Sequence, residues 1–70
     1  MMTPDEIADA LERIATRYQN IASSFRITGR FNHAATAQAR SDAFRDAAQI
    51  AREGRDIDWA MFDHRFPPDV

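Results

Sequence analysis

The 70-residue sequence contains no cysteine and no lysine, and it has only two glycines. Without cysteine, the chain can form neither a disulfide nor a thiolate metal site. Two isolated glycines, Gly29 and Gly54, cannot supply the glycine-rich loops that bind phosphates or dinucleotides. A domain of this size has a thin core that disulfides or a metal often supplement. The sequence therefore leaves close helix packing, or association with another chain, as the source of stability.

Long apolar runs are also absent. No segment approaches the roughly 20 apolar residues that a membrane span needs. The N-terminus carries Asp5, Glu6 and Asp9, whereas a signal peptide would begin with basic residues. The net charge of −2 is neither as basic as that of a typical nucleic-acid binder nor as acidic as that of a DNA mimic. We therefore expect a cytoplasmic protein with no leader and no membrane span.

One apolar stripe dominates the first half of the chain. Its members recur at alternating steps of four and three residues, which is typical of one face of an amphipathic helix. A capping box formed by Thr3 and Glu6, with Pro4 at the first helical position, predicts where this helix begins. Gly29 is a suitable C-cap, so the sequence predicts a helix at about 4–28. The stripe consists of Ile7, Leu11, Ile14, Tyr18, Ile21 and Phe25.

A second helix is predicted at about 33–53, capped by Asn32 and ended by Gly54. The connection before it is short, so the two helices should run antiparallel. The outer face of this helix is polar, and its inner face is rich in small side chains that let helix axes approach closely. We therefore expect the first helix to supply bulk and the second to supply a close-fitting floor. The predicted inner face comprises Ala37, Ala43, Phe44, Ala47, Ile50 and Ala51.

The C-terminal segment is rich in aromatic and acidic residues. Asp56 or Asp58 is a suitable cap for a short helix at about 57–65, and a tail follows at 67–70. Trp59, Phe62 and Phe66 fall on one face of that helix. Two interpretations remain open for these aromatics. They either fold back and close the core, or they form an exposed set of anchors for a partner.

Together these patterns predict a single all-α domain over residues 1–70. Its architecture is an antiparallel helical hairpin with two long helices plus a short C-terminal helix. One hairpin of this length covers a wide apolar stripe poorly, so we expect two copies to pair into a dimeric bundle.

Arg40 is the most unusual charged position, because it falls inside the apolar face of the second helix. An arginine there needs a partner, either a carboxylate of the C-terminal segment or of another subunit, or an acid or phosphate on a binding partner. Arg26, Arg30 and His33 are near it in the sequence around the turn, and these residues form either a solvated cap at the turn or a modest basic patch. His33 and His64 do not stand at a metal-ligand spacing, so no metal or other cofactor is expected.

We find no arrangement typical of nucleophilic catalysis, and a helical hairpin offers little concavity for a substrate. The sequence therefore predicts a non-enzymatic protein-binding module with no small-molecule substrate, either a regulator, an adaptor or an inhibitor. It would act by occlusion or scaffolding through its helix faces. Its length and layout would suit a protein encoded by a phage or mobile element. The predicted partner-binding residues are Arg26, Arg30, Arg40, Trp59, Phe62 and Phe66.

In size, acidity and hairpin layout the chain resembles the Rop-type helical hairpins. The resemblance includes no matching motif, so no functional residue is carried over from it. It implies a dimeric four-helix bundle that binds RNA. A first alternative is therefore a nucleic-acid binder in which a dimer aligns Arg26, Arg30 and Arg40 across its two-fold axis. A second alternative is a structural subunit of a larger assembly.

Overall fold

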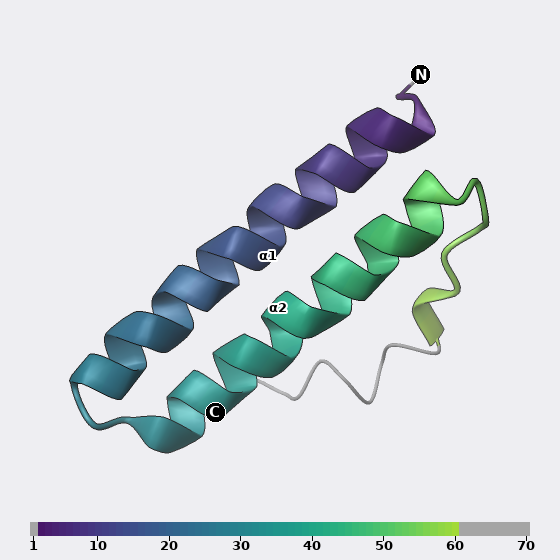
Figure 1. Cartoon of the computed structure of the whole chain (residues 1–70). Helices are drawn as coiled ribbons and strands as arrows, with labels where there is room; N and C mark the ends of the chain where they lie inside the picture. The colour runs from purple at the N-terminus through teal and green to yellow at the C-terminus, as the bar shows by residue number, and fades with distance from the viewer. Residues whose placement is uncertain (1, 61–70) are drawn as a thin grey trace.

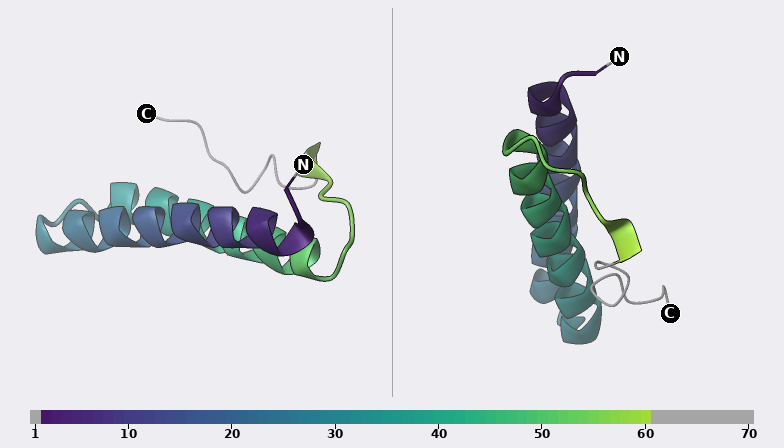
Figure 2. Two further views of the ribbon diagram at one scale, coloured as in Figure 1. Left: turned by 90° about the horizontal axis from the view of Figure 1, so that it is seen from above. Right: turned by 90° about the vertical axis from the view of Figure 1, so that its right-hand side faces the viewer.

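The computed structural model describes residues 2–60, which form two long antiparallel helices (Figure 1). Helix α1 spans Pro4–Ile27 and helix α2 spans Phe31–Arg52, and no strand occurs among the described residues. The predicted all-α hairpin is thereby confirmed. After α2, residues 53–60 turn back over one broad face of the hairpin (Figure 2). Most of the predicted short helix at 57–65, and the tail at 67–70, lie outside the described residues.

The start of α1 has the predicted capping box. The Thr3 hydroxyl accepts a hydrogen bond from the Glu6 backbone N–H at 3.2 Å, and the Glu6 carboxylate accepts one from the Thr3 N–H at 3.4 Å. Pro4 occupies the first helical position, where its missing N–H has no intrahelical partner to lose. The N-terminus of α1 is therefore specified by local sequence alone.

Both helices end in the same left-handed glycine cap. Gly29 has φ 76° and donates its N–H to the Arg26 carbonyl at 3.1 Å, while the Arg30 N–H reaches the Phe25 carbonyl at 2.8 Å. Gly54, with φ 74°, ends α2 through the same pair of hydrogen bonds. This Schellman arrangement satisfies carbonyls that the helix leaves unpaired. It also feeds the chain from Gly29 directly into α2.

That direct entry overturns the prediction that Asn32 caps the second helix. Arg30 is the N-cap residue and makes no side-chain capping bond, so α2 begins at Phe31 and Asn32 lies inside its first turn. The C-cap of α1 and the N-cap of α2 share one backbone segment. The geometry of the first cap therefore decides where the second helix begins.

A small residue at every seventh position lines the contact between the helices. Ala8, Ala15 and Ala22 on α1 are fully buried. On α2 the corresponding row is Ala34, Ser41 and Ala48. This repeat is typical of helices that pack with knobs into holes at a small crossing angle. We call these two rows the seam.

A buried hydrogen bond shows how closely the helices approach at the seam. The Ser41 hydroxyl donates to the backbone carbonyl of Ala15 at 2.8 Å, so a side chain of α2 reaches the main chain of α1. A second row on each helix alternates with the seam rows along the same contact. On α1 it holds the larger Leu11, Tyr18 and Phe25, and on α2 it holds Phe44 between the small Ala37 and Ala51.

The seam changes the predicted division between bulk and floor. Both helices contribute small residues to the contact, because alanine facing alanine lets the two backbones come together. The large isoleucines of the predicted stripe are displaced to the flank of α1. Ile7 is 37% exposed and Ile21 is 44% exposed. Of the six stripe residues, these two are exposed and the other four are buried or half-buried, and the pairing of two hairpins over them stays a prediction.

Candidate functional site

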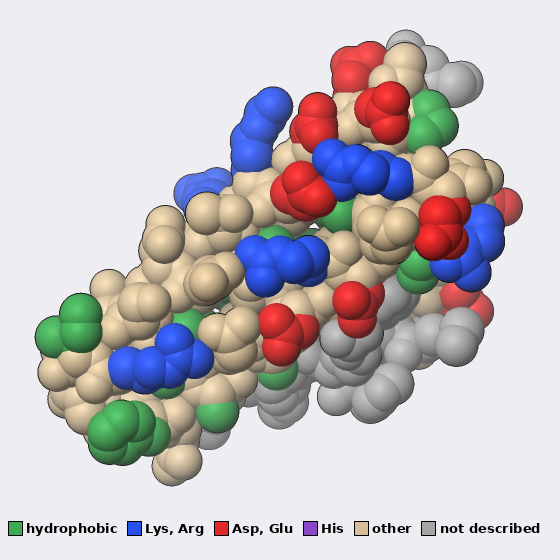
Figure 3. All heavy atoms as spheres, viewed as in Figure 1, with side chains coloured by type: hydrophobic (Ala, Val, Ile, Leu, Met, Phe, Trp, Pro, Cys, Tyr) green, Lys and Arg blue, Asp and Glu red, His purple; other side chains and the backbone are tan. Residues whose placement is uncertain are grey.

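One broad face of the hairpin is held together by polar bridges between α1 and α2. Figure 3 shows arginine side chains lying along the junction of the two helices on this face. Three arginines supply the bridges, one near each end and one in the middle. Arg52 contacts Asp9 at 2.8 Å and Glu12 at 2.5 Å, Arg45 donates to Gln19 at 2.9 Å, and Arg26 donates to Gln38 at 3.1 Å. We call this the bridged face.

Arg52 is the most strongly paired of these arginines. Its hydrogen bond to Glu12 raises the pKa of the guanidinium above its ordinary value, and the nearby charges of Glu12, Asp9 and Asp5 act in the same direction. The pair spans the two helices rather than one helix turn. It therefore links the start of α1 to the end of α2, and its charged groups are bonded to one another within the chain.

The opposite face carries isoleucines that the seam does not use. The most exposed large apolar side chains, Ile27 at 85% and Phe31 at 68%, lie instead at the two helix ends that flank the turn. Ile7, Ile14 and Ile21 form a row with a seven-residue repeat along α1, beside a second row made of the buried Leu11 and the half-buried Tyr18 and Phe25. The two rows together have the alternating steps of three and four residues that are typical of a helix-packing surface. From α2, His33, Arg40 and Phe44 complete this surface. We call it the apolar face.

Ring contacts tie the two helices together on the apolar face. Tyr18 stacks on Phe44 with ring centroids 5.7 Å apart and planes only 7° from parallel. The Arg40 guanidinium carbon lies 5.7 Å from the centre of the Tyr18 ring, a cation–π distance. Nearer the turn, Phe25 contacts His33 at 5.2 Å. The unusual arginine is thus seated on an aromatic ring. Its predicted carboxylate partner stays a prediction.

A shallow groove of about 400 Å³ opens on this face close to the turn. Its walls combine aromatic rings with cationic side chains, and both helices contribute to it. We call it the turn-end groove. Its principal lining residues are Tyr18, Ile21, Phe25, Arg30, His33 and Arg40.

A second hollow, of about 540 Å³, lies at the opposite end of the hairpin, where the helices meet the 53–60 segment. Ile7 and Trp59 line it, together with Ile57, which packs against the core. Trp59 remains 47% exposed there. The apolar face therefore has an aromatic group at each end, with the isoleucine row between them.

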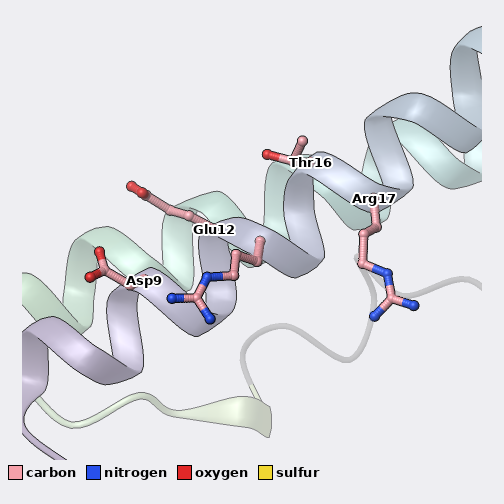
Figure 4. Close-up of a pocket in the computed structure, with 5 residues that line it drawn as sticks. Asp9, Glu12, Thr16 and Arg17 are labelled. Atoms are coloured by element: carbon pink, nitrogen blue, oxygen red, sulfur yellow. The ribbon is translucent and has the colours of Figure 1, made fainter.

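A third hollow, of about 510 Å³, lies on α1 alone (Figure 4). In Figure 4 the side chains of Asp9 and Glu12 point to one side of the helix, and Arg17 points away from them. The lining side chains stand on the outside of a single helix, and α2 contributes none of them. This arrangement does not converge on a point where a substrate could react.

The structure separates the residues that the sequence grouped as a binding surface. Arg30 and Arg40 share the turn-end groove. Arg26 instead reaches Gln38 on the bridged face. Trp59 lies at the other end of the hairpin. Phe62 and Phe66 lie outside the described residues.

Two features were missed by the sequence reasoning although a signal for them exists. Ser41 was not singled out from the sequence, yet it forms the hydrogen bond across the seam. The seven-residue spacing of Ala34, Ser41 and Ala48 marks it as a seam position. The same spacing of Ile7, Ile14 and Ile21 marks a separate apolar row.

Among residues 2–60, no group of three or more acidic or histidine side chains is placed to hold a metal ion. The two helices described here are also not apolar enough over their length to cross a membrane. Comparisons with family models, with curated proteins and with solved structures gave no match. The function is therefore argued from the two faces alone.

Proposed function

We propose that this chain is a non-enzymatic protein-binding module whose binding surface is the apolar face. The observation that carries the proposal is the isoleucine row, because Ile7 and Ile21 remain 37% and 44% exposed at either end of it. Single exposed apolar side chains are ordinary, but a continuous row along a helix indicates an interaction surface. The bridged face has its polar groups joined within the chain and is the less suitable surface.

The spacing of the apolar face indicates what kind of partner it takes. Alternating steps of three and four residues present a seam to which a second helix packs at a crossing angle of about 20°. The row runs from Ile7 to Ile21, which is four helical turns. A partner that offers one helix of matching length would cover it.

The polar and aromatic groups at the two ends would set specificity. Arg30 and Arg40 in the turn-end groove suit carboxylates on the partner, because guanidinium groups bind carboxylates in a bidentate fashion. Trp59 would serve as an anchor at the other end, as tryptophan commonly does at interfaces. A regulator, adaptor or inhibitor in the cytoplasm that occludes or scaffolds a partner would work in this way.

The proposal is tested with a photo-crosslinking amino acid placed at Ile21 on the apolar face and, in a matched variant, at Gln49 on the exposed outer side of α2. We expect one protein to be crosslinked from position 21 in the native cells, and not from position 49. The crosslinked protein would then be purified and titrated with the wild type and with Ile21→Asp. Equal crosslinking from both positions, or unchanged binding by Ile21→Asp, would overturn the proposal.

Nucleic-acid binding remains the alternative, and one observation favours it. The turn-end groove places Arg30 and Arg40 beside the rings of Tyr18 and Phe25, and single-stranded nucleic acids bind through cations and aromatic stacking. Arg26 does not join them, because it bonds on the other face. Binding of random RNA that weakens steeply with salt would support this alternative, because phosphate contacts release counterions.

A further inference from the structure

The small net charge of the chain conceals a strong separation of charge along the hairpin. Residues 13–45, which we call the turn half, carry six arginines and one aspartate, a net charge of +5. Residues 2–12 and 46–60, which we call the open half, carry eight acidic residues and two arginines, a net charge of −6. Because α1 and α2 are antiparallel, each half is also one end of the rod.

The broad side of the molecule is comparable in size to one side of a protein–protein interface. The molecule measures 40 × 21 × 16 Å along its principal axes. Its broad side is therefore of the same order as the roughly 800 Å² that each partner contributes to a standard interface, and residues 53–60 take up part of it beside Ile7. The 24-residue α1 of a second copy is long enough to cover the isoleucine row.

We propose that the partner of the apolar face is a second copy of this chain, packed about a two-fold axis perpendicular to the helices. The two turns then lie at opposite ends of a four-helix bundle. The proposal rests on the proposed function and names its partner. Because the same patch is used on both chains, each contact occurs twice across the axis.

Charge decides between this arrangement and the one with both turns at the same end. In the proposed arrangement the basic turn half of each copy faces the acidic open half of the other. In the alternative, two turn halves with a net charge of +5 each lie at one end and two open halves with a net charge of −6 each lie at the other, counting the charges of the bridged face. Like charges across an interface are strongly unfavourable, and complementary charges fix the orientation of docking. The turn-end groove, with Arg30 and Arg40, would then receive acidic side chains of the partner copy.

The orientation is testable with single cysteines because the natural chain contains none. His33→Cys places a thiol near the turn and Ile7→Cys places one near the open end, both on the apolar face. With a short bismaleimide, we expect a covalent dimer from an equimolar mixture of the two variants and little from either alone. A Gln49→Cys variant, on the outer side of α2, is the control for random collision.

A charge-reversal variant tests the cause of the orientation. Arg17→Glu combined with Arg30→Glu changes two exposed arginines of the turn half. We expect its dimer to dissociate at about tenfold higher protein concentration than an Asn20→Asp control, with unchanged helicity by circular dichroism. The wild-type dimer should also weaken as salt is raised. An unchanged dissociation constant for the double variant would overturn the role assigned to charge.

Two other results would overturn the proposed dimer. A monomeric mass by light scattering at every concentration would exclude the second copy. Covalent dimers from each cysteine variant alone, but not from their mixture, would show both turns at one end. In either case the photo-crosslinking test at Ile21 still reports on a different protein partner. Failure of this dimer is therefore distinguishable from failure of the proposed function.

Discussion

The two broad faces of the hairpin are built from the same two helices but differ in how their side chains are used. One is joined by polar contacts, and the other leaves apolar side chains exposed. On the bridged face, Arg26, Arg45 and Arg52 join α1 to α2 through polar side chains. On the apolar face, Ile7 and Ile21 remain exposed beside a few ring contacts. The seam between the faces contains mostly alanine and contributes little width. The difference shows that polar side chains join the two helices on one face, while the other face leaves isoleucines of α1 exposed.

The largest expected effect comes from overfilling the seam on which both faces depend. Ala15→Leu inserts a large side chain where Ala15 is fully buried and its carbonyl accepts a hydrogen bond from Ser41 of α2. Overpacking of this kind costs about 1–3 kcal/mol, which is much of the stability of a domain this small. Urea unfolding followed by circular dichroism measures the loss. Ala35→Leu, on an exposed part of α2, should leave the midpoint nearly unchanged, and equal effects of the two would contradict the seam.

The next largest effect is expected on association through the apolar face, which the bridged face should not influence. Ile21→Asp places a charge on the apolar face, and we expect association to weaken by about 2 kcal/mol, the loss typical of an interface hot spot. The helical content at high concentration should change little, since Ile21 is outside the seam. Sedimentation equilibrium measures the dissociation constant. Asn20→Asp adds the same charge on the exposed side of α1, and a comparable loss there would mean that net charge rather than the apolar face is responsible.

A smaller effect is expected from the single hydrogen bond within the seam. Ser41→Ala removes the bond to the Ala15 carbonyl but keeps the small size of the residue. A loss of about 1 kcal/mol in the free energy of unfolding is expected, as for a typical buried hydrogen bond. Chemical denaturation would measure it, with Ser23→Ala on the exposed surface as the control. A more stable Ser41→Ala variant would show that close packing alone determines the seam.

The smallest effect is expected on the bridged face. Arg52→Ala removes the contacts to Asp9 and Glu12, which lie largely in solvent. Exposed ion pairs contribute little and are screened by salt, so the shift in urea midpoint should be smaller than for Ser41→Ala and should fade at high salt. Arg13→Ala is the control on the outer side of α1. A salt-independent loss larger than that of Ser41→Ala would reverse the ranking of the two contacts.

The features that could be predicted from the sequence were those encoded by a few neighbouring residues. Thr3 and Glu6 form their capping box, and Gly29 and Gly54 adopt the left-handed conformation expected of them. The prediction for Asn32 was wrong because the cap at Gly29 extends into α2, so the two helix ends are not independent. Local signals therefore fixed the helices but not the way in which they join.

Which residues meet across the hairpin was harder to predict. Large apolar side chains dominate the periodicity, so the stripe through Ile7 and Ile21 concealed the alanine row one position further along. A helical wheel also shows on which face of α2 Arg52 lies, but it does not show which residues of α1 stand opposite. The contacts of Arg52 with Asp9 and Glu12 depend on that alignment of the two helices. The grouping of the candidate site residues was equally hard to predict, because it also depends on how the two helices align. Arg30 and Arg40 meet in one groove, while Arg26 and Trp59 lie elsewhere.

The three-residue connection between Ile27 and Phe31 has a consequence for the alignment of the helices. The seven-residue repeat of small residues would by itself allow α2 to slide by one heptad along α1. The tight turn, closed by the Arg30 and Gly29 hydrogen bonds, opposes that slide together with the Tyr18–Phe44 stack and the Arg52 contacts. Lengthening it with flexible residues would give the helices alternative registers and would allow α2 to pair with a neighbouring chain. The length of the turn thus selects one register of α2 on α1 from the several that the alanine repeat would allow.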